Sequence, residues 1–206
     1  MIQIVNVEQG SDEWRAARAG MPTASMFKDA LAKGEGKVRR TYMMKLIGER
    51  LTGALSEGYS NGHMERGQEM EPEARDAYAW LNDVQPEQVG FVVNDSLIDL
   101  GPIGCSPDSL IGESGLLEIK TKLPHIQCEL LLQDRVPPEH LKQIHGAIWV
   151  CEKEWLDLVS YWPGLPTFIK RVHRDEKVIA ELKTGLTEFY AEMLELEQKI
   201  RGLYAP

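Results

Sequence analysis

A short stretch in the middle of the chain places charged groups inside the pattern of an apolar strand. Residues 115–121 read Gly-Leu-Leu-Glu-Ile-Lys-Thr, so Glu118 and Lys120 interrupt a run that would otherwise be buried. Buried charges are costly unless they pair or bind a metal ion. Side chains alternate along a strand, so both charged groups project from one face. Asp108 lies ten residues before Glu118, and Gly112 supplies a turn residue for a hairpin that would bring the two carboxylates together.

Two carboxylates and a lysine on one sheet face are typical of a divalent-metal site that acts on phosphate esters. Carboxylate oxygens suit hard cations such as Mg²⁺, which often bridges to substrate phosphates. A charged lysine cannot be a ligand, so Lys120 would orient or help deprotonate the water that attacks phosphorus. This chemistry is phosphodiester hydrolysis. The competing interpretation is a half-exposed strand whose Glu118 and Lys120 are satisfied by solvent and by each other.

The charge of the chain is unevenly distributed. The net charge is −9 at pH 7, which at first argues against nucleic acid as a partner. Residues 15–50, however, contain nine basic residues against three acidic ones, a charge of +6 that leaves −15 for the remainder. A basic region within an acidic exterior would suit a DNA channel, whereas the alternative is a pair of solvated helix faces.

Length and composition predict one globular domain. The chain has 206 residues, of which 43% are hydrophobic and 27% charged, enough for a single sizeable core. Its start lacks the features of a signal peptide, and no apolar run approaches membrane-spanning length, so we expect a cytosolic protein with no membrane partner. Three widely spaced cysteines argue against a disulfide framework or a zinc site and are expected to be reduced.

Periodicity predicts an α/β fold, with a central mixed sheet of about five strands flanked by helices. Helices are expected over residues 11–18, 23–31, 38–53, 63–81 and 139–151 and from residue 175 onward. Strands are expected over residues 89–93, 97–103, 115–121, 156–162 and 168–173. The single domain, 1–206, would comprise a mostly helical part at 1–85, a sheet core at 86–173 and a C-terminal helix at 174–206.

Two of the predicted helices leave alternatives open. Pro72 falls inside the fourth, so Glu71 would lie at a break or at a new helix start unless proline kinks a continuous helix. The many acidic residues there also fit an ordinary solvated surface helix. The C-terminal helix carries a heptad seam that could pack on the domain or on another subunit, and we expect the first. The seam consists of Ile179, Leu182, Leu186, Phe189, Met193, Leu196, Ile200 and Leu203.

Five motifs, taken in order, resemble a known nuclease family. They are Gln9 to Trp14 with Arg18, Gly20 and Thr23-Ala24-Ser25; Gly67 with Glu71 and Ala74; Ser106-Pro107-Asp108; Leu117-Glu118-Ile119-Lys120; and Gln143 to Trp149. This series is similar to the phage lambda exonuclease group, also called YqaJ-type viral recombinases. That group lies within the restriction-endonuclease-like PD-(D/E)xK nucleases. The resemblance runs from residue 9 to about residue 173.

The resemblance implies a set of catalytic and metal-binding residues. Asp108, Glu118 and the backbone carbonyl of Ile119 would hold two Mg²⁺ ions, with Mn²⁺ as a substitute. Lys120 would manage the attacking water. Glu71 would be a further active-site acid near the metals and the terminal nucleotide.

The resemblance also implies the residues that bind DNA. Arg18, Ser25, Ser106 and Gln143 would form a pocket for a 5′ phosphate, a chemically sensible set because a guanidinium with hydroxyl and amide donors satisfies phosphate oxygens. Lys37, Arg39 and Arg40 are candidates for contacts with the DNA backbone. His145 stands where relatives often carry a glutamine, and we expect it on the helix surface.

The function implied is a Mg²⁺-dependent exonuclease that degrades duplex DNA from 5′-phosphorylated ends, leaving single-stranded DNA for recombination. The family forms ring-shaped trimers and works with a phage single-strand annealing protein, so both are expected partners. The setting would be the cytosol of a bacterial host of a phage or prophage. The alternatives are an endonuclease of the same superfamily and a non-catalytic module that binds DNA ends or an annealing partner.

Overall fold

The protein is described from a computed structural model that covers residues 1–33, 37–55 and 62–203. Seven strands, seven α-helices and two short 3₁₀ helices are assigned within these residues. Their order is β1 (Ile2–Val5), α1 (Asp12–Arg18), η1 (Ala24–Met26), α2 (Phe27–Ala30), α3 (Lys37–Thr52), α4 (Gly62–Asn82), β2 (Phe91–Asn94), β3 (Ile103–Cys105), β4 (Ser109–Ile111), β5 (Gly115–Thr121), α5 (Pro124–Gln133), η2 (Pro138–His140), α6 (Leu141–Val150), β6 (Trp155–Tyr161), β7 (Phe168–His173) and α7 (Glu176–Gly202).

The α/β class and the central mixed sheet are confirmed, but the strands form two sheets, so the mixed sheet has four strands instead of about five. Strands β1, β2 and β3 make an antiparallel sheet. Strands β4, β5, β6 and β7 make the second sheet, in which only the β5–β6 pair is parallel. A parallel pair needs a long crossover, and α5 and α6 supply it. The mixed sheet is therefore built around β5, the strand that carries Glu118 and Lys120.

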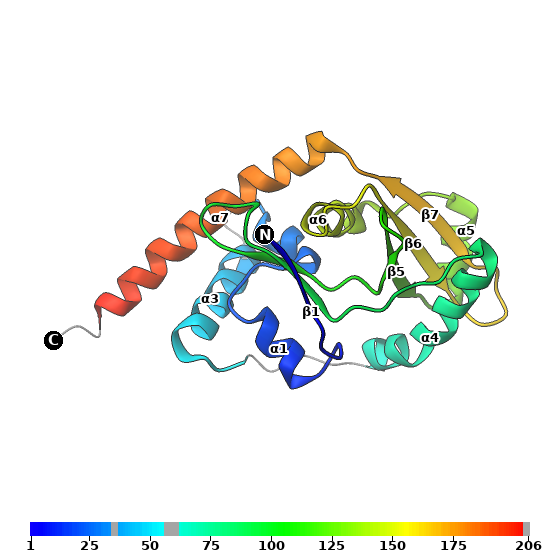
Figure 1. The fold of residues 1–206 in the computed structure, drawn as a ribbon, viewed down its shortest axis with the longest axis horizontal. Helices are drawn as coiled ribbons and strands as arrows, with labels where there is room; N and C mark the ends of the chain where they lie inside the picture. Colours follow the sequence, from blue (N-terminus) through cyan, green and yellow to red (C-terminus); the bar gives the residue numbers. More distant parts are fainter. Residues whose placement is uncertain (34–36, 56–61, 204–206) are drawn as a thin grey trace.

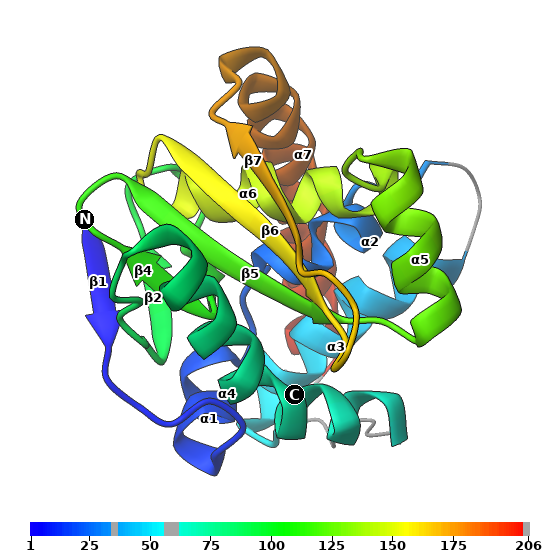
Figure 2. The ribbon, with the colours of Figure 1, turned by 90° about the vertical axis from the view of Figure 1, so that its right-hand side faces the viewer.

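Helices cover both faces of the mixed sheet (Figures 1 and 2). On one face, Leu116 of β5 joins a core with α2, α3, α6 and α7. On the other face, Leu117 and Ile119 pack with Ala74 and Tyr78 of α4. Because these alternate residues are anchored on opposite sides, the predicted alternation along β5 is confirmed and its register cannot slip without exposing apolar side chains.

The starts of α1 and α7 agree with elementary capping rules. The Ser11 side chain accepts a hydrogen bond from the backbone N–H of Trp14 at 3.1 Å, which caps α1. Asp175 caps α7 by accepting from the Lys177 N–H at 2.9 Å. Helix α4 continues through Pro72 and changes direction along its length (Figure 2), so the kinked alternative is the one observed.

Three local expectations were wrong or incomplete. The strand predicted at 97–103 is a turn-rich segment followed by the short strand β3, because Asp95, Ser96 and Asp99 favour turns over a ladder. Helix α5 was missed, although proline is favoured in the first turn of a helix and Pro124 begins it. Strand β1 was also missed, and its residues are mostly exposed.

The seam of α7 packs on the domain itself, as expected. Ile179, Leu182, Leu186, Phe189 and Met193 are buried in the larger core, and Leu196 and Ile200 pack partly against it. Leu203 departs from this pattern because it is 83% exposed at the end of the helix. The projecting end of α7 is visible in Figure 1. No helix in the described part of the chain is long and apolar enough to cross a membrane.

Gly90 fixes the path of the segment that leads from β1 to α1. An alanine methyl group there would approach backbone atoms of Val5 and Val7 closer than van der Waals contact, and backbone cannot move aside as a side chain can. We expect Gly90→Ala to lower the free energy of unfolding by about 1–3 kcal/mol in urea denaturation. Gly48→Ala in α3 is the matched control, because nothing lies within 4 Å of the added methyl, and it should stabilise by about 0.5–1 kcal/mol. Equal loss in both variants would contradict this explanation.

Candidate active site

The β4–β5 hairpin brings Asp108 beside β5. Ser109 pairs with Leu117, and the Asp108 backbone N–H donates to the Leu117 carbonyl at 3.2 Å. The Asp108 carboxylate then accepts a hydrogen bond from the backbone N–H of Ile119 at 2.5 Å. The hairpin anticipated from the glycine turn is therefore present, and it fixes the carboxylate on the strand that holds Glu118.

Glu118 is the centre of a hydrogen-bonded group that joins β5 to α6. The side chain is buried, with 5% of the residue exposed. Its Oε1 accepts from Lys120 Nζ at 2.6 Å and from Gln143 Nε2 at 2.5 Å. A buried carboxylate with two such donors is held in one orientation. The alternative of two solvated charges on a wet strand does not describe this site.

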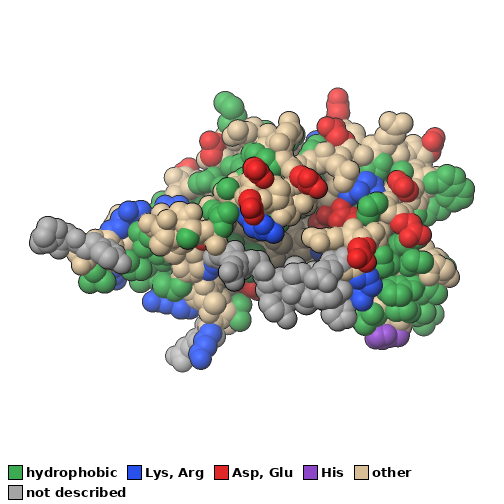
Figure 3. Space-filling model, turned by 90° about the horizontal axis from the view of Figure 1, so that it is seen from below, with side chains coloured by type: hydrophobic (Ala, Val, Ile, Leu, Met, Phe, Trp, Pro, Cys, Tyr) green, Lys and Arg blue, Asp and Glu red, His purple; other side chains and the backbone are tan. Residues whose placement is uncertain are grey.

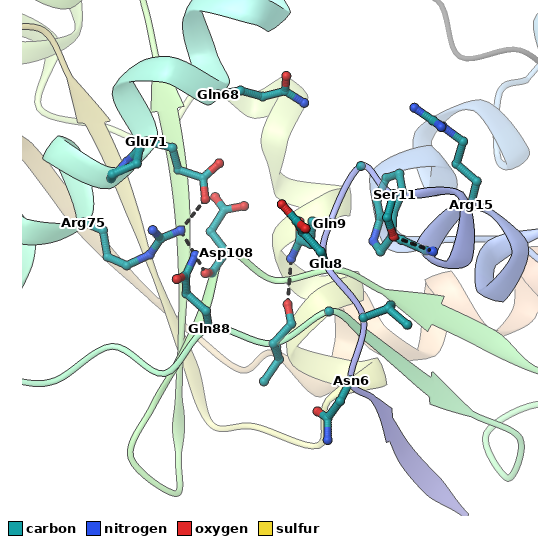
Figure 4. Close-up of a pocket in the computed structure, with 16 residues that line it drawn as sticks. Asn6, Glu8, Gln9, Ser11, Arg15, Gln68, Glu71, Arg75, Gln88 and Asp108 are labelled. Atoms are coloured by element: carbon teal, nitrogen blue, oxygen red, sulfur yellow. Dashed lines mark hydrogen bonds and ion pairs between the residues drawn. The ribbon is translucent and has the colours of Figure 1, made fainter.

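Glu71 reaches the same region from α4. Its carboxylate forms an ion pair with Arg75 one turn later on the helix. The Arg75 guanidinium also donates from Nε to Ser109 Oγ at 3.0 Å and from Nη2 to the Asp108 carbonyl at 3.4 Å. Figure 4 shows Glu71 and Asp108 close together with Arg75 beside them. The structure therefore brings all four predicted catalytic residues, Glu71, Asp108, Glu118 and Lys120, to one place.

The carboxylates repel one another strongly. Burial, followed by the charges of Glu118 and Glu71, raises the pKa of Asp108 well above its usual range. Burial alone would lower the pKa of Lys120, but the surrounding carboxylates outweigh that effect and raise it. Lys120 is therefore protonated at neutral pH and acts as a hydrogen-bond donor.

The donor set fits a hard divalent cation. Asp108 and Glu118 offer carboxylate oxygens, and a cation between them would relieve the repulsion that raises the pKa of Asp108. Within residues 1–33, 37–55 and 62–203, no group of three or more His, Cys, Asp or Glu side chains is arranged to hold a metal. Two carboxylates completed by backbone oxygen and water nevertheless match the usual Mg²⁺ site, which keeps several waters. The carbonyl of Ile119 remains a predicted ligand.

A second polar group lies two residues before Asp108. Ser106 Oγ accepts hydrogen bonds from Arg18 Nη1 and from Trp14 Nε1, both at 2.9 Å. The Arg18 guanidinium lies over the Trp14 ring, 4.0 Å from its centroid. Burial lowers the pKa of Arg18, and the arginine remains charged. Two of the four residues predicted to bind a 5′ phosphate are thus in direct contact.

The other two predicted phosphate-binding residues are placed differently. Gln143 donates to Glu118, so it joins the carboxylate cluster. Ser25 is exposed in η1, and its hydroxyl lies 3.4 Å from Thr23 Oγ1. Their contact with a phosphate stays a prediction.

A large cleft runs past these groups. Its volume is about 1090 Å³, and the segment from Asn6 to Ser11 faces α4 across it. Figure 4 shows Glu8 and Gln9 opposite Glu71 and Asp108, with Gln68 directed into the space. Gln9 holds its segment in place by donating to the Val89 carbonyl at 2.8 Å and the Pro107 carbonyl at 3.0 Å.

A smaller pocket also borders Glu71, between α4 and β5. It has a volume of about 320 Å³ and is bounded by Gln68, Lys120, Thr121 and Lys122. Burial lowers the pKa of Lys122, and nearby Lys120 lowers it further. The two pockets share Gln68 and Glu71 of α4.

The basic residues of α3 make contacts within the domain. Arg39 forms an ion pair with Glu192 of α7, and its guanidinium lies 5.3 Å from the Phe189 ring centroid. Arg40 Nη1 lies 4.0 Å from Glu192 Oε1, and Lys37 is exposed at the start of α3. On the described part of the face in Figure 3, acidic and basic side chains are interspersed around a hollow. Contact of these residues with DNA therefore remains a prediction.

Sequence reasoning misplaced one residue and missed two others. His145 is buried in α6, so its expected surface position is wrong. Arg75 was not singled out, although its spacing of four from Glu71 favours a helical ion pair. Trp14 was recognised only as part of a motif. Its indole N–H in an amphipathic first helix could have indicated a polar partner.

The chain is similar to known proteins in both sequence and structure. A model of the YqaJ-like viral recombinase domain matches residues 13–154, more than half of the chain. The crystal structure of an alkaline exonuclease, LHK-Exo, from Laribacter hongkongensis is 34% identical, with a TM-score of 0.83 over 93% of this chain and 96% of that one. The complex of LHK-Exo with dAMP is 35% identical, with the same TM-score and coverage.

A more distant structure shares the fold alone. A phage related exonuclease from Haemophilus somnus 129PT is 11% identical, with a TM-score of 0.59 over 89% of this chain and 96% of that one. A comparison with curated protein sequences gives no significant match. The domain match and the similarity to LHK-Exo agree with the resemblance carried by the motifs, and the chain belongs to the YqaJ-like viral recombinase family.

Proposed function

We propose that this protein is a Mg²⁺-dependent exonuclease that removes nucleotides from 5′-phosphorylated ends of duplex DNA. The observation that carries the proposal is the short distance along the chain between the predicted phosphate-binding group and the carboxylate cluster. Ser106, in contact with Arg18, lies two residues before Asp108, in the carboxylate cluster. Two residues span at most roughly 7 Å. A terminal phosphate bound at Ser106 would thus leave one nucleotide between that phosphate and the bond to be cut.

The residues of the cluster have distinct roles in the proposed hydrolysis. Asp108, Glu118 and the Ile119 carbonyl would hold Mg²⁺, which when bound stabilises charge on the transferring phosphoryl group. Lys120, protonated and fixed by Glu118, donates a hydrogen bond that orients the attacking water. Glu71 faces the same space from α4 and accepts a proton or orients the terminal nucleotide.

The relatives support an exonuclease rather than another nuclease class. LHK-Exo is an alkaline exonuclease, and its structure with dAMP shows that it binds a mononucleotide. The same ligand class suits the product of cutting one nucleotide from an end. We also propose that the protein forms a ring-shaped homotrimer, acts with a phage single-strand annealing protein and works in the bacterial cytosol. A solution mass equal to one chain would contradict the ring.

The dependence on a DNA end gives the first test. With Mg²⁺, wild-type protein should release nucleotides from 5′-phosphorylated linear duplex and leave the complementary strand intact. Covalently closed circular duplex should be spared, because it offers no terminal phosphate. Release is followed as acid-soluble label placed in one strand at a time. Cutting of the closed circle would instead indicate an endonuclease, and absence of release from every substrate would favour a non-catalytic module.

Asp108→Asn tests the cation site. We expect nucleotide release to fall by about 10²-fold or more, because the cation loses a charged ligand. Mg²⁺ at about 100 times its dissociation constant should stabilise wild-type protein by roughly 2.7 kcal/mol in thermal unfolding, and the variant far less. Asp95→Asn, on the exposed carboxylate that pairs with the N-terminus, is the control.

The same variant carries a prediction about stability without metal. The pKa of Asp108 is raised in the folded state, so ionising this carboxylate costs more in the folded than in the unfolded protein. Without metal, the free energy of unfolding should therefore fall as the pH rises above about 3.9, the ordinary pKa of an aspartate. Asp108→Asn should therefore be at least as stable as wild type at neutral pH without metal. A large loss of stability would show that the carboxylate has a structural role.

Arg18→Lys tests the phosphate-binding group. Lysine keeps the charge but loses the planar fork that reaches Ser106 and stacks on Trp14. We expect the preference for phosphorylated over unphosphorylated 5′ ends to fall by about tenfold, mainly through a higher KM. Arg174→Lys, at the β7–α7 junction, should keep the wild-type preference. An unchanged preference in Arg18→Lys would remove Arg18 from the phosphate pocket.

A further inference from the structure

Arg75 contacts both walls of the carboxylate cluster. It is a buried residue of α4, with 9% of its surface exposed. It forms an ion pair with Glu71 on its own helix and donates to Ser109 Oγ and the Asp108 carbonyl on the hairpin. With its amide oxygen turned inward, Gln88 accepts from both Arg75 terminal nitrogens at 3.0 and 3.2 Å. Figure 4 shows Glu71, Asp108 and Gln88 around the Arg75 guanidinium.

The negative charges of the cluster explain why it contains Arg75 in addition to Lys120. Three carboxylates, Glu71, Asp108 and Glu118, lie within mutual electrostatic reach. Lys120 pairs with Glu118, and Arg75 pairs with Glu71. In the described structure this leaves Asp108, held by one backbone N–H, as the carboxylate with no ion pair. Lys120 and Arg75 thus compensate two of the three carboxylates. Asp108, the predicted metal ligand, keeps a negative charge that no side chain in the described part of the chain compensates.

The contacts of Arg75 require the shape of arginine as well as its charge. A guanidinium is planar and offers five donors, and here Nε and both terminal nitrogens are used in different directions. One ammonium group cannot reach Ser109, Gln88 and Glu71 from a single point. α4 and the hairpin belong to different parts of the chain, and Arg75 adds a polar bridge between them at the cluster, beside the apolar core that packs α4 on β5.

We propose that Arg75 is a positioning residue that sets the distance between Glu71 on α4 and Asp108 on the hairpin, and so presets the cation site. The proposal rests on the proposed nuclease function, but it concerns cation binding and can be measured without DNA. Arg75 acts through the two acids and does not contact the scissile phosphate. The site is therefore organised before the cation arrives, which avoids reorganisation during binding.

Arg75→Lys is the central variant, because it preserves the charge and removes the bridge. Titration calorimetry with Mn²⁺ or Mg²⁺, without DNA, should show binding about 10- to 100-fold weaker than in wild type. The Mg²⁺ concentration giving half-maximal nucleotide release should rise by a similar factor, while KM for linear duplex stays near the wild-type value. The matched control is Arg201→Lys on α7, which alters an ion pair with the same four-residue spacing, to Glu197. It should leave cation binding unchanged.

Ser109→Ala provides an independent variant if Arg75→Lys fails to fold. It removes the acceptor of Arg75 Nε and leaves the guanidinium in place. The variant also removes the hydrogen bond from the Ser109 hydroxyl to the Asp108 carbonyl, at 2.5 Å. Loss of the Arg75 hydrogen bond should weaken cation binding by at least roughly fivefold in the same direction. Unchanged cation binding in Ser109→Ala, in a preparation whose thermal unfolding is normal, would overturn the proposal.

The remaining outcomes separate this proposal from its alternatives. If Arg75→Lys binds cations as wild type does but has a raised KM, Arg75 contacts DNA and the positioning role is wrong. If the variant matches wild type in both measurements, Arg75 serves only to satisfy buried polar groups. If wild-type protein binds cations but degrades no DNA, the nuclease proposal fails while the comparison of cation affinities still decides the role of Arg75.

Discussion

The confinement of three carboxylates in one partly buried cluster is the constraint on which the rest of the site depends. Like charges at this distance destabilise a fold unless each has a compensating donor or cation. Lys120 and Gln143 stabilise Glu118, Arg75 stabilises Glu71, and the Ile119 N–H reaches Asp108. The compensation is incomplete at Asp108, whose carboxylate has no ion pair among the described residues. Incomplete compensation lowers the stability of the metal-free protein and favours cation binding, and both effects have the same electrostatic origin.

The fold keeps this cluster in place by holding β5 from both sides. Leu116 belongs to the core with α6, whereas Leu117 and Ile119 belong to the core with α4. A strand anchored in this way cannot rotate to release its charged residues toward solvent. The parallel pairing with β6 and the hairpin with β4 fix the strand along its length. The two cores therefore determine where the chemistry lies, although none of their side chains has a chemical role.

Much of this arrangement was accessible from the sequence, and the limits have physical causes. Alternation in residues 115–121 and the glycine turn were sufficient for the hairpin and for the common face of Glu118 and Lys120. Contacts between distant segments were inaccessible, because periodicity describes one element at a time. The bridge from Arg75 to the hairpin depends on how α4 crosses β5, and the division into two sheets depends on which strands pair across the chain. The motif order indicated which residues matter but gave no information on which of them touch.

Gln143 shows how two functions can meet in one side chain. Sequence resemblance assigns it to the phosphate pocket, and the structure places its amide on Glu118. An amide nitrogen carries two hydrogens, and Glu118 accepts only one of them. The second hydrogen can serve a phosphate oxygen, so both positions are compatible. A terminal phosphate that attracted this amide would also change the donor set around Glu118. Recognition of the DNA end and organisation of the carboxylates would then be linked through a single hydrogen-bonded group, on the α6 side of the same strand that Arg75 supports from the α4 side.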